Sequence, residues 1–168
     1  GGATTTAVNY TPITGGETTA VMSRVLTQVQ TQIRALSLVG IASANVVIKW
    51  IPRAFDATTD PLPCIMITPA PMPEPMPQDL MNTDKVHYPV LISMIAAQNE
   101  DYDENVARNL LWRQKINREF RYRQLSGIPE IVHCLPMPKS QIDPNWFQKN
   151  VWHSSMIMAF VSREVRGN

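Results

Sequence analysis

The segment Glu100–Gly127, EDYDENVARNLLWRQKINREFRYRQLSG, constrains the fold of this chain more than any other segment. It begins with carboxylates, carries apolar residues at helical spacing, becomes rich in arginine and stops at a glycine. This pattern predicts one long amphipathic helix with a strongly basic second half. The segments on both sides have the composition of strands, so we expect the helix to belong to a protein that also contains a sheet.

One face of the predicted helix is apolar, and two polar residues, Arg113 and Asn117, fall within that face. An arginine in such a place needs a carboxylate, or a neighbouring subunit that supplies one. Alternatively it lies at the edge of the apolar face and extends its charge to solvent. The sequence leaves both alternatives open. The apolar residues of this face are Val106, Leu110, Trp112, Ile116 and Phe120.

Helix-end electrostatics explains much of the charge in this segment. Carboxylates are favoured at the start of a helix, where they interact with free amides and the helix dipole, and cations are favoured at its end. The cations here are distributed around the axis, whereas helices that bind nucleic acid usually concentrate them on one face. Duplex recognition is therefore only weakly indicated. The cations are Arg108, Arg113, Lys115, Arg118, Arg121 and Arg123.

The remaining elements place the chain in the α+β class. A second amphipathic helix is predicted from Glu17 to about Leu36, and the predicted strands follow β-branched, aromatic and alternating patterns. We expect a mainly antiparallel sheet of about five strands with two long helices packed on it, in the order α-β-β-β-α-β-β. Pro89 inside the third strand predicts a bulge or an edge position. The predicted strands span residues 45–52, 64–70, 86–98, 130–138 and 151–165.

Two segments without helical or strand patterns are predicted to be arms. Residues 1–16 are rich in Gly and Thr and form a flexible N-terminal arm, which leaves residues 17–168 as a single domain. Pro69–Lys85 has alternating prolines, which favour an extended hairpin arm between the second and third strands. It is either a solvated loop or a contact arm with adaptable methionines. Its candidate contact residues are Met72, Glu74, Met76, Asp79 and Met81.

Composition and spacing argue against an enzyme. The seven glycines include no GxxxxGK[ST] or GxGxxG motif, so phosphate-binding loops of those kinds are excluded. Histidines and cysteines show no spacing of a metal site, and His133 and Cys134 would point to opposite faces of a strand. We therefore expect no catalytic residue, no metal and no cofactor, and two buried, reduced thiols at Cys64 and Cys134.

The balance of charge also limits the partners of the chain. The net charge is +1 and only 17% of the 168 residues are charged, so the surface is not generally basic. Few charges suit a surface that other chains cover. The sequence shows neither a bilayer-spanning segment nor a signal peptide, so we expect synthesis in the cytoplasm.

In its element order and its second half, the chain resembles the tail-terminator (tail-completion) proteins of long-tailed bacteriophages. The resemblance covers about residues 17–166 and rests on the segments YPVLISMIAA, ARNLLWRQKINREF, LSGIPEIVHCLPMP and NVWHSSMIMAFVSRE. It implies a small α+β protomer that forms a ring, typically a hexamer, on the head-proximal end of the tail. Such a ring stops polymerisation of the tail tube and joins the tail to the head. No catalytic residue of the family exists to be transferred.

The resemblance also implies partners and a location. The partners are further copies of the chain, the tail-tube protein and possibly the sheath protein, head-side neck proteins, and DNA that passes through the channel without sequence-specific binding. The protein would be part of the virion and assemble in the host cytoplasm, away from membranes. Alternatives are another neck component, such as a head-completion or stopper protein, and a nucleic-acid-binding domain. Candidate contacts with a subunit or the channel are Arg108, Arg113, Lys115, Asn117, Arg118, Arg121 and Arg123.

Overall fold

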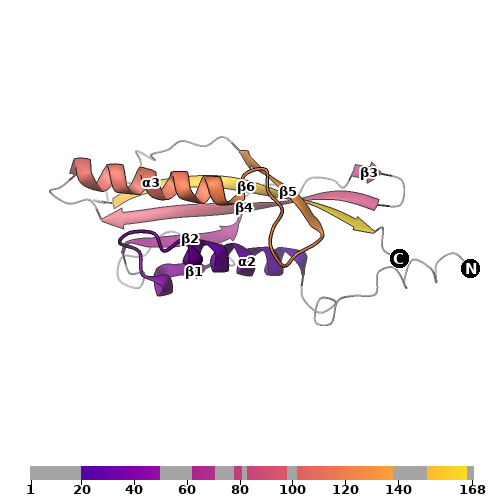
Figure 1. Ribbon diagram of the computed structural model, residues 1–168, viewed down its shortest axis with the longest axis horizontal. Helices are drawn as coiled ribbons and strands as arrows, with labels where there is room; N and C mark the ends of the chain where they lie inside the picture. The colour runs from indigo at the N-terminus through magenta and orange to yellow at the C-terminus, as the bar shows by residue number, and fades with distance from the viewer. Residues whose placement is uncertain are drawn as a thin grey trace, which may run out of the picture.

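A computed structural model describes residues 20–49, 62–70, 78–80, 83–97, 102–137 and 151–165 of the chain. Two helices and a mixed sheet form an α+β fold, in which α3 lies along β4 and β6 and α2 lies beside β1 and β2 (Figure 1). The α+β class and the two helices were predicted correctly. The elements are α2 (Val21–Ala35), the 3₁₀ turn η1 (Ser43–Asn45), β1 (Val46–Ile48), β2 (Cys64–Pro69), β3 (Gln78–Leu80), β4 (Thr83–Ala97), α3 (Tyr102–Phe120), β5 (Ile131–Met137) and β6 (Val151–Val165).

The sheet is built around two long strands, β4 and β6. They pair antiparallel over their whole length, from Thr83 opposite Val165 to Ala97 opposite Val151. The strand order is β1-β2-β4-β6-β5, and the short β3 pairs with the start of β4. The expected sheet needs one correction, because β1 and β2 run parallel and are therefore not joined by a hairpin.

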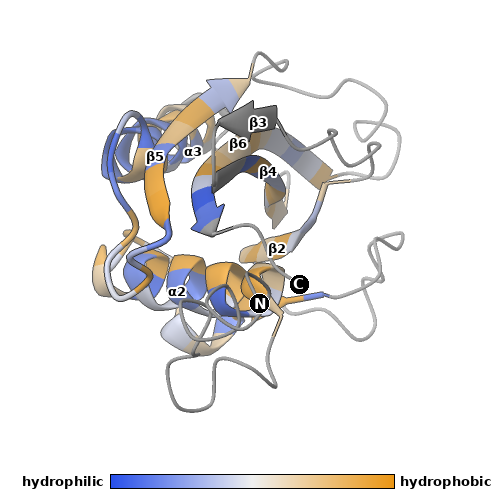
Figure 2. Cartoon of the chain, turned by 90° about the vertical axis from the view of Figure 1, so that its right-hand side faces the viewer, coloured by the Kyte–Doolittle hydropathy of each residue, from blue (hydrophilic) through white to orange (hydrophobic). Residues whose placement is uncertain are grey.

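Alternation along the strands directs one face of the sheet to both helices. On β4 the even-numbered residues, such as Ile92 and Met94, are fully buried in the main core, and their partners on β6 include Met156 and Met158. From the helices, Leu26 and Trp112 enter the same core. Figure 2 shows hydrophobic residues along these strands and on part of α2. The opposite face carries a second, smaller cluster of Cys64, Met66, Ile95 and Val151.

Pro89 lies within β4 without a bulge or an edge strand, which corrects the expectation for this residue. β4 is flanked by β2 and β6, and its register with β6 is continuous through the pair Pro89–Ala159. The carbonyl of Pro89 accepts a hydrogen bond from the amide of Ala70, at 2.9 Å, just beyond the end of β2. Because the nitrogen and carbonyl of a strand residue point to the same side, the missing N–H of Pro89 faces β2 and costs the β4–β6 ladder nothing.

The helix α3 is shorter at its end than the sequence pattern predicts. It stops at Phe120, so Arg121 and Arg123 lie in the turn that follows and not in the helix. Tyr122 adopts the left-handed region with φ 57°, and its amide donates to the carbonyl of Cys134 at 2.7 Å. A left-handed residue ends a helix and redirects the chain, here toward β5.

Contacts between side chains fix the helices to the rest of the fold. Arg24 of α2 forms a two-pronged ion pair with Glu130 before β5, at 2.8 and 3.3 Å. Gln32 of α2 donates to Glu119 of α3 at 3.0 Å. The two carboxylates closest in sequence to the end of α3 are therefore engaged within the chain.

Both predicted arms fall largely outside the described residues. Residues 1–16 are not among those described, and neither are Met72, Glu74, Met76 and Met81. Asp79 belongs to β3, where its backbone pairs with that of Asp84. The proposal that Pro69–Lys85 is a contact arm stays a prediction.

Candidate functional site

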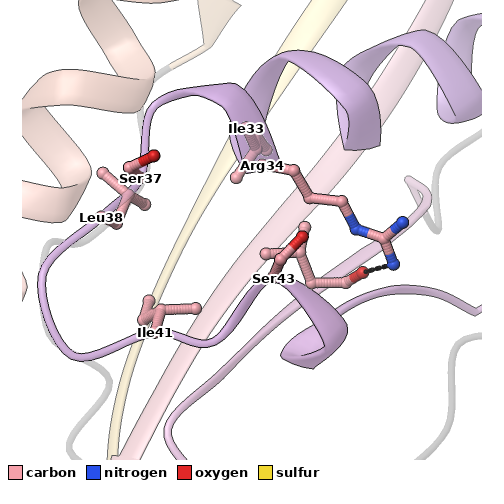
Figure 3. Close-up of a pocket in the computed structure, with 7 residues that line it drawn as sticks. Ile33, Arg34, Ser37, Leu38, Ile41 and Ser43 are labelled. Atoms are coloured by element: carbon pink, nitrogen blue, oxygen red, sulfur yellow. Dashed lines mark hydrogen bonds between the residues drawn. The ribbon is translucent and has the colours of Figure 1, made fainter.

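Metal sites, membrane-spanning helices and pockets are three common kinds of functional feature to seek in the described part of the chain. No group of three or more His, Cys, Asp or Glu residues there is arranged to hold a metal ion. Neither helix of that part is long and apolar enough to cross a membrane. A pocket of about 170 Å³ lies between the end of α2 and η1, where Arg34 donates to the carbonyl of Val46 at 3.0 Å (Figure 3). It is smaller than the roughly 300–1,000 Å³ of usual small-molecule sites.

The polar residues singled out on α3 are the best-defined candidates, and the structure divides them into two groups. Arg108 and Arg113 are half-buried and pack within the chain. Lys115, Arg118 and the two arginines after the helix are exposed. The division follows from helix geometry, because Arg113 shares the core-facing side with Trp112 and Ile116 whereas Lys115 and Arg118 point away from it.

Arg108 is part of the contact between α3 and the loop after α2. Its guanidinium lies over the ring of Trp112, with 4.7 Å between Cζ and the ring centroid. The indole Nε1 of Trp112 donates to the carbonyl of Val39 at 2.8 Å. Gly40, at φ +83°, leaves room for this arginine, because a Cβ there would lie 3.0 Å from its Nη1. Arg108 therefore has a structural role within the chain.

Arg113 reaches inward to β6. Its Nη1 donates to the hydroxyl of Ser154 at 2.9 Å and to the carbonyl of Ser155. Burial lowers the pKa of Arg113 from its usual value. The acceptors that the structure describes are thus a hydroxyl and a carbonyl on the neighbouring strand, and the carboxylate partner that the sequence suggested stays a prediction.

Asn109, one turn before Arg113, is a polar residue that sequence reasoning did not single out. It is fully buried, and both atoms of its amide group lack a hydrogen-bond partner in the described part of the chain. The indole nitrogen of Trp152 on β6 is likewise buried without a partner. The face of α3 that meets the sheet therefore contains both satisfied and unsatisfied polar groups.

The exposed group forms a surface that we call the cationic corner, defined as Lys115, Arg118, Arg121, Tyr122 and Arg123. Among the residues that the structure describes, none of its four cations takes part in an ion pair. Its one described side-chain hydrogen bond joins Arg121 to the Oδ1 of Asn117 at 3.5 Å. Asn117, a candidate from the sequence, thus borders the corner and is partly buried.

Tyr122 is the residue of this surface that the sequence analysis missed. Its side chain is 70% exposed, which makes it the most exposed of the large hydrophobic residues in the described ranges. A bulky residue with positive φ is uncommon and strained. The signal in the sequence was an aromatic between two arginines, RYR, but the expected continuation of the helix to Gly127 concealed that the chain turns there.

The corner continues in two directions along the surface. Leu111, 41% exposed, precedes Lys115 and Arg118 at helical spacing, so the three share one outward stripe of α3. On the other side a hollow of about 510 Å³ lies against the loop from Gln124 to Ile131. Within the described part of the chain, the arrangement supplies four cations without an ion pair, an exposed aromatic ring and a rigid support, which suits binding of another molecule.

A second group of titratable residues lies on the sheet face opposite the helices. His87 of β4 and His133 of β5 are both opposite Val161 of β6, and Lys85 is two residues before His87. Burial, with the nearby charges of Lys85 and His133, lowers the pKa of His87 from 6.5. These described neighbours are all basic, and none of them is a carboxylate that could orient a catalytic histidine.

No protein-family model matches the chain, and no curated protein matches it in sequence.

Proposed function

We propose that this chain is a structural virion protein that forms a ring at the head-proximal end of a bacteriophage tail. In this proposal the ring, with six protomers, ends polymerisation of the tail tube and joins the tail to the head. It contacts the tail-tube protein, the head-side neck proteins and, in a contractile tail, the sheath protein. DNA passes through its channel without sequence-specific binding, and the protein catalyses no reaction.

The observation that supports this proposal most is the cationic corner. Four cations and an exposed tyrosine lie together on a chain with a net charge of only +1, and no carboxylate of the described residues neutralises them. Exposed like charges repel one another, so a cluster of them is favoured where another molecule supplies the opposite charge. The α+β architecture with two helices agrees with the resemblance to tail-terminator proteins, and finer features, such as the Pro69–Lys85 arm, fit contacts between rings.

The oligomeric state tests the proposal directly. We expect analytical ultracentrifugation or native mass spectrometry of the full chain to detect a closed ring, alone or after addition of tail-tube protein. Tail tubes assembled with the protein should have one capped end in electron micrographs. A protein that stays monomeric under both conditions, and leaves tube length unchanged, would contradict the proposal.

Another neck component, such as a head-completion or stopper protein, is the second candidate, because the same resemblance includes it. Imaging of the assembled particle separates the two functions. A tail terminator lies in contact with the last ring of the tail tube, whereas a head-completion protein lies against the portal.

A further inference from the structure

We propose that the cationic corner binds the phosphate backbone of duplex DNA, independently of its sequence. The inference deepens the proposed function and rests on it for the choice of DNA as the polyanion, because DNA passes through the ring in that function. It assigns the contact to Lys115, Arg118, Arg121, Tyr122 and Arg123 and leaves Arg108 and Arg113 out, since both pack within the chain.

The first step concerns charge. The two carboxylates closest in sequence are already engaged, since Glu119 accepts a hydrogen bond from Gln32 and Glu130 is paired with Arg24. As far as the described residues go, the four cations of the corner therefore keep their charge available to another molecule. Binding of cations to DNA phosphates releases condensed counterions, which is the main source of sequence-independent affinity.

The second step concerns geometry. Lys115 and Arg118 lie one turn apart on the outward side of α3, and Arg121 and Arg123 follow just after the end of the helix. The four exposed cations are therefore close enough along the chain to face the phosphates of one DNA strand. Tyrosine hydroxyls also donate to phosphate oxygens, and arginine does so with two parallel hydrogen bonds.

The third step concerns the backbone. The amide of Tyr122 is held by the carbonyl of Cys134 in β5, and the amide of Arg121 by the carbonyl of Asn117. These bonds fix the strained residue and so fix the places from which the two arginines extend. Side chains that are positioned before binding lose less entropy when a ligand orders them.

Stabilisation of the helix end does not account for the whole corner. The dipole favours cations within the last turn, and it explains Arg118. Its effect falls off within one turn, whereas Lys115 lies more than one turn from the end and Arg123 lies beyond it. Helix stability also gives no reason to expose an aromatic ring in a left-handed conformation.

The test measures binding of the full chain to a fluorescein-labelled 30-base-pair duplex of mixed sequence by anisotropy, between 50 and 200 mM salt. We expect the double variant R121Q/R123Q to lose about tenfold or more in affinity at 100 mM salt. The slope of log K against log salt should fall by about 0.9 for each phosphate contact removed. A duplex of scrambled sequence should bind the wild type equally well.

The matched control is R34Q/R163Q, which removes two charges from exposed arginines on α2 and β6, together with the hydrogen bond from Arg34 to the carbonyl of Val46. We expect it to change affinity less than about threefold, because nonspecific attraction is weakened only slightly away from a contact. Tyr122→Phe removes a single hydroxyl and should weaken binding a few-fold without altering the fold. Circular dichroism and a thermal melt check that each variant is folded.

Three outcomes would overturn the inference: no binding of the wild-type chain at 50 mM salt, equal losses in the two double variants, or loss of the ring in R121Q/R123Q with DNA binding unchanged. The last would show that the corner meets an acidic surface of another protein. Sedimentation of the same samples separates the two proposals. A ring that ignores DNA contradicts only the inference, whereas a DNA-binding monomer that never assembles contradicts the proposed function.

Discussion

The packed arginines, Arg108 and Arg113, and the cationic corner come from one stretch of the chain, yet they have opposite surroundings. Arg108 lies against an aromatic ring and Arg113 bonds to β6, while the four cations of the corner are exposed and unpaired in the described part of the chain. The position of each residue relative to the sheet makes this difference. The same residue type therefore packs within the chain on one side of α3, while on the other side it has no ion-pair partner among the described residues.

The largest expected effect is that of Arg113→Ala. The change leaves the hydroxyl of Ser154 and the carbonyl of Ser155 without their described donor and removes a half-buried side chain from the core face. We expect the free energy of unfolding to fall by about 2–4 kcal/mol, measured by urea denaturation. Arg118→Ala, the matched change at an exposed position, should stay within about 0.5 kcal/mol. Equal losses at the two positions would remove the distinction between the groups.

Asn109→Leu, also on the core face of α3, is expected to stabilise the protein, whereas Arg113→Ala is expected to destabilise it. Asn109 is fully buried and its amide lacks partners in the described ranges, so folding removes it from water without replacing its hydrogen bonds. A leucine of similar size removes that cost, and we expect the free energy of unfolding to rise by about 1–2 kcal/mol. Thermal melts of the variant and of the wild type measure the change. A large loss of stability would show that the amide has a partner in the folded protein.

The contrast between these residues also shows what the sequence predicts and what it does not. The alternation in Val151–Val165 predicted β6 with its observed bounds. Successive side chains of a strand point to opposite faces of the sheet, so the residue types alternate along the whole strand. Apolar spacing likewise predicted α2 and the core face of α3. These patterns depend only on residues close in sequence, so they can be recognised without knowledge of the tertiary contacts.

The features that were missed depend on contacts distant in sequence. The parallel pairing of β1 with β2 is set by the path of the chain between them, which hydrophobic periodicity does not contain. The end of α3 depends on the bond from Tyr122 to Cys134, twelve residues on. The sequence placed Arg113 within the apolar face but did not show its partners on β6, because these require the position of that strand.

Tyr122→Asn examines the cationic corner without touching its charges. Asparagine tolerates positive φ better than tyrosine, and the ring it replaces is 70% exposed, so little packing is lost. We expect the free energy of unfolding to rise by about 0.5–1 kcal/mol.

Burial raises the pKa of the Cys134 thiol to about 12, so this thiol should stay unreactive toward a disulfide reagent in both proteins. Faster labelling of Cys134 in the variant would show that the side chain of Tyr122 limits the access of the reagent to this thiol.

The smallest expected effect concerns His87, whose surroundings combine partial burial with nearby cations. Its pKa is lowered from 6.5 by burial first, then by Lys85 and His133, so the unfolded chain takes up a proton at a higher pH than the folded one. This contribution to stability is present above pH 6.5 and is lost as the pH falls toward the lowered pKa. His87→Gln removes that loss, and urea denaturation between pH 7.5 and 5.5 should give a shallower decline for the variant than for the wild type. Parallel declines would mean that His87 has the same pKa in the folded and the unfolded chain. Partial burial on this face would then lower the pKa of a cationic group less than it does at Arg113.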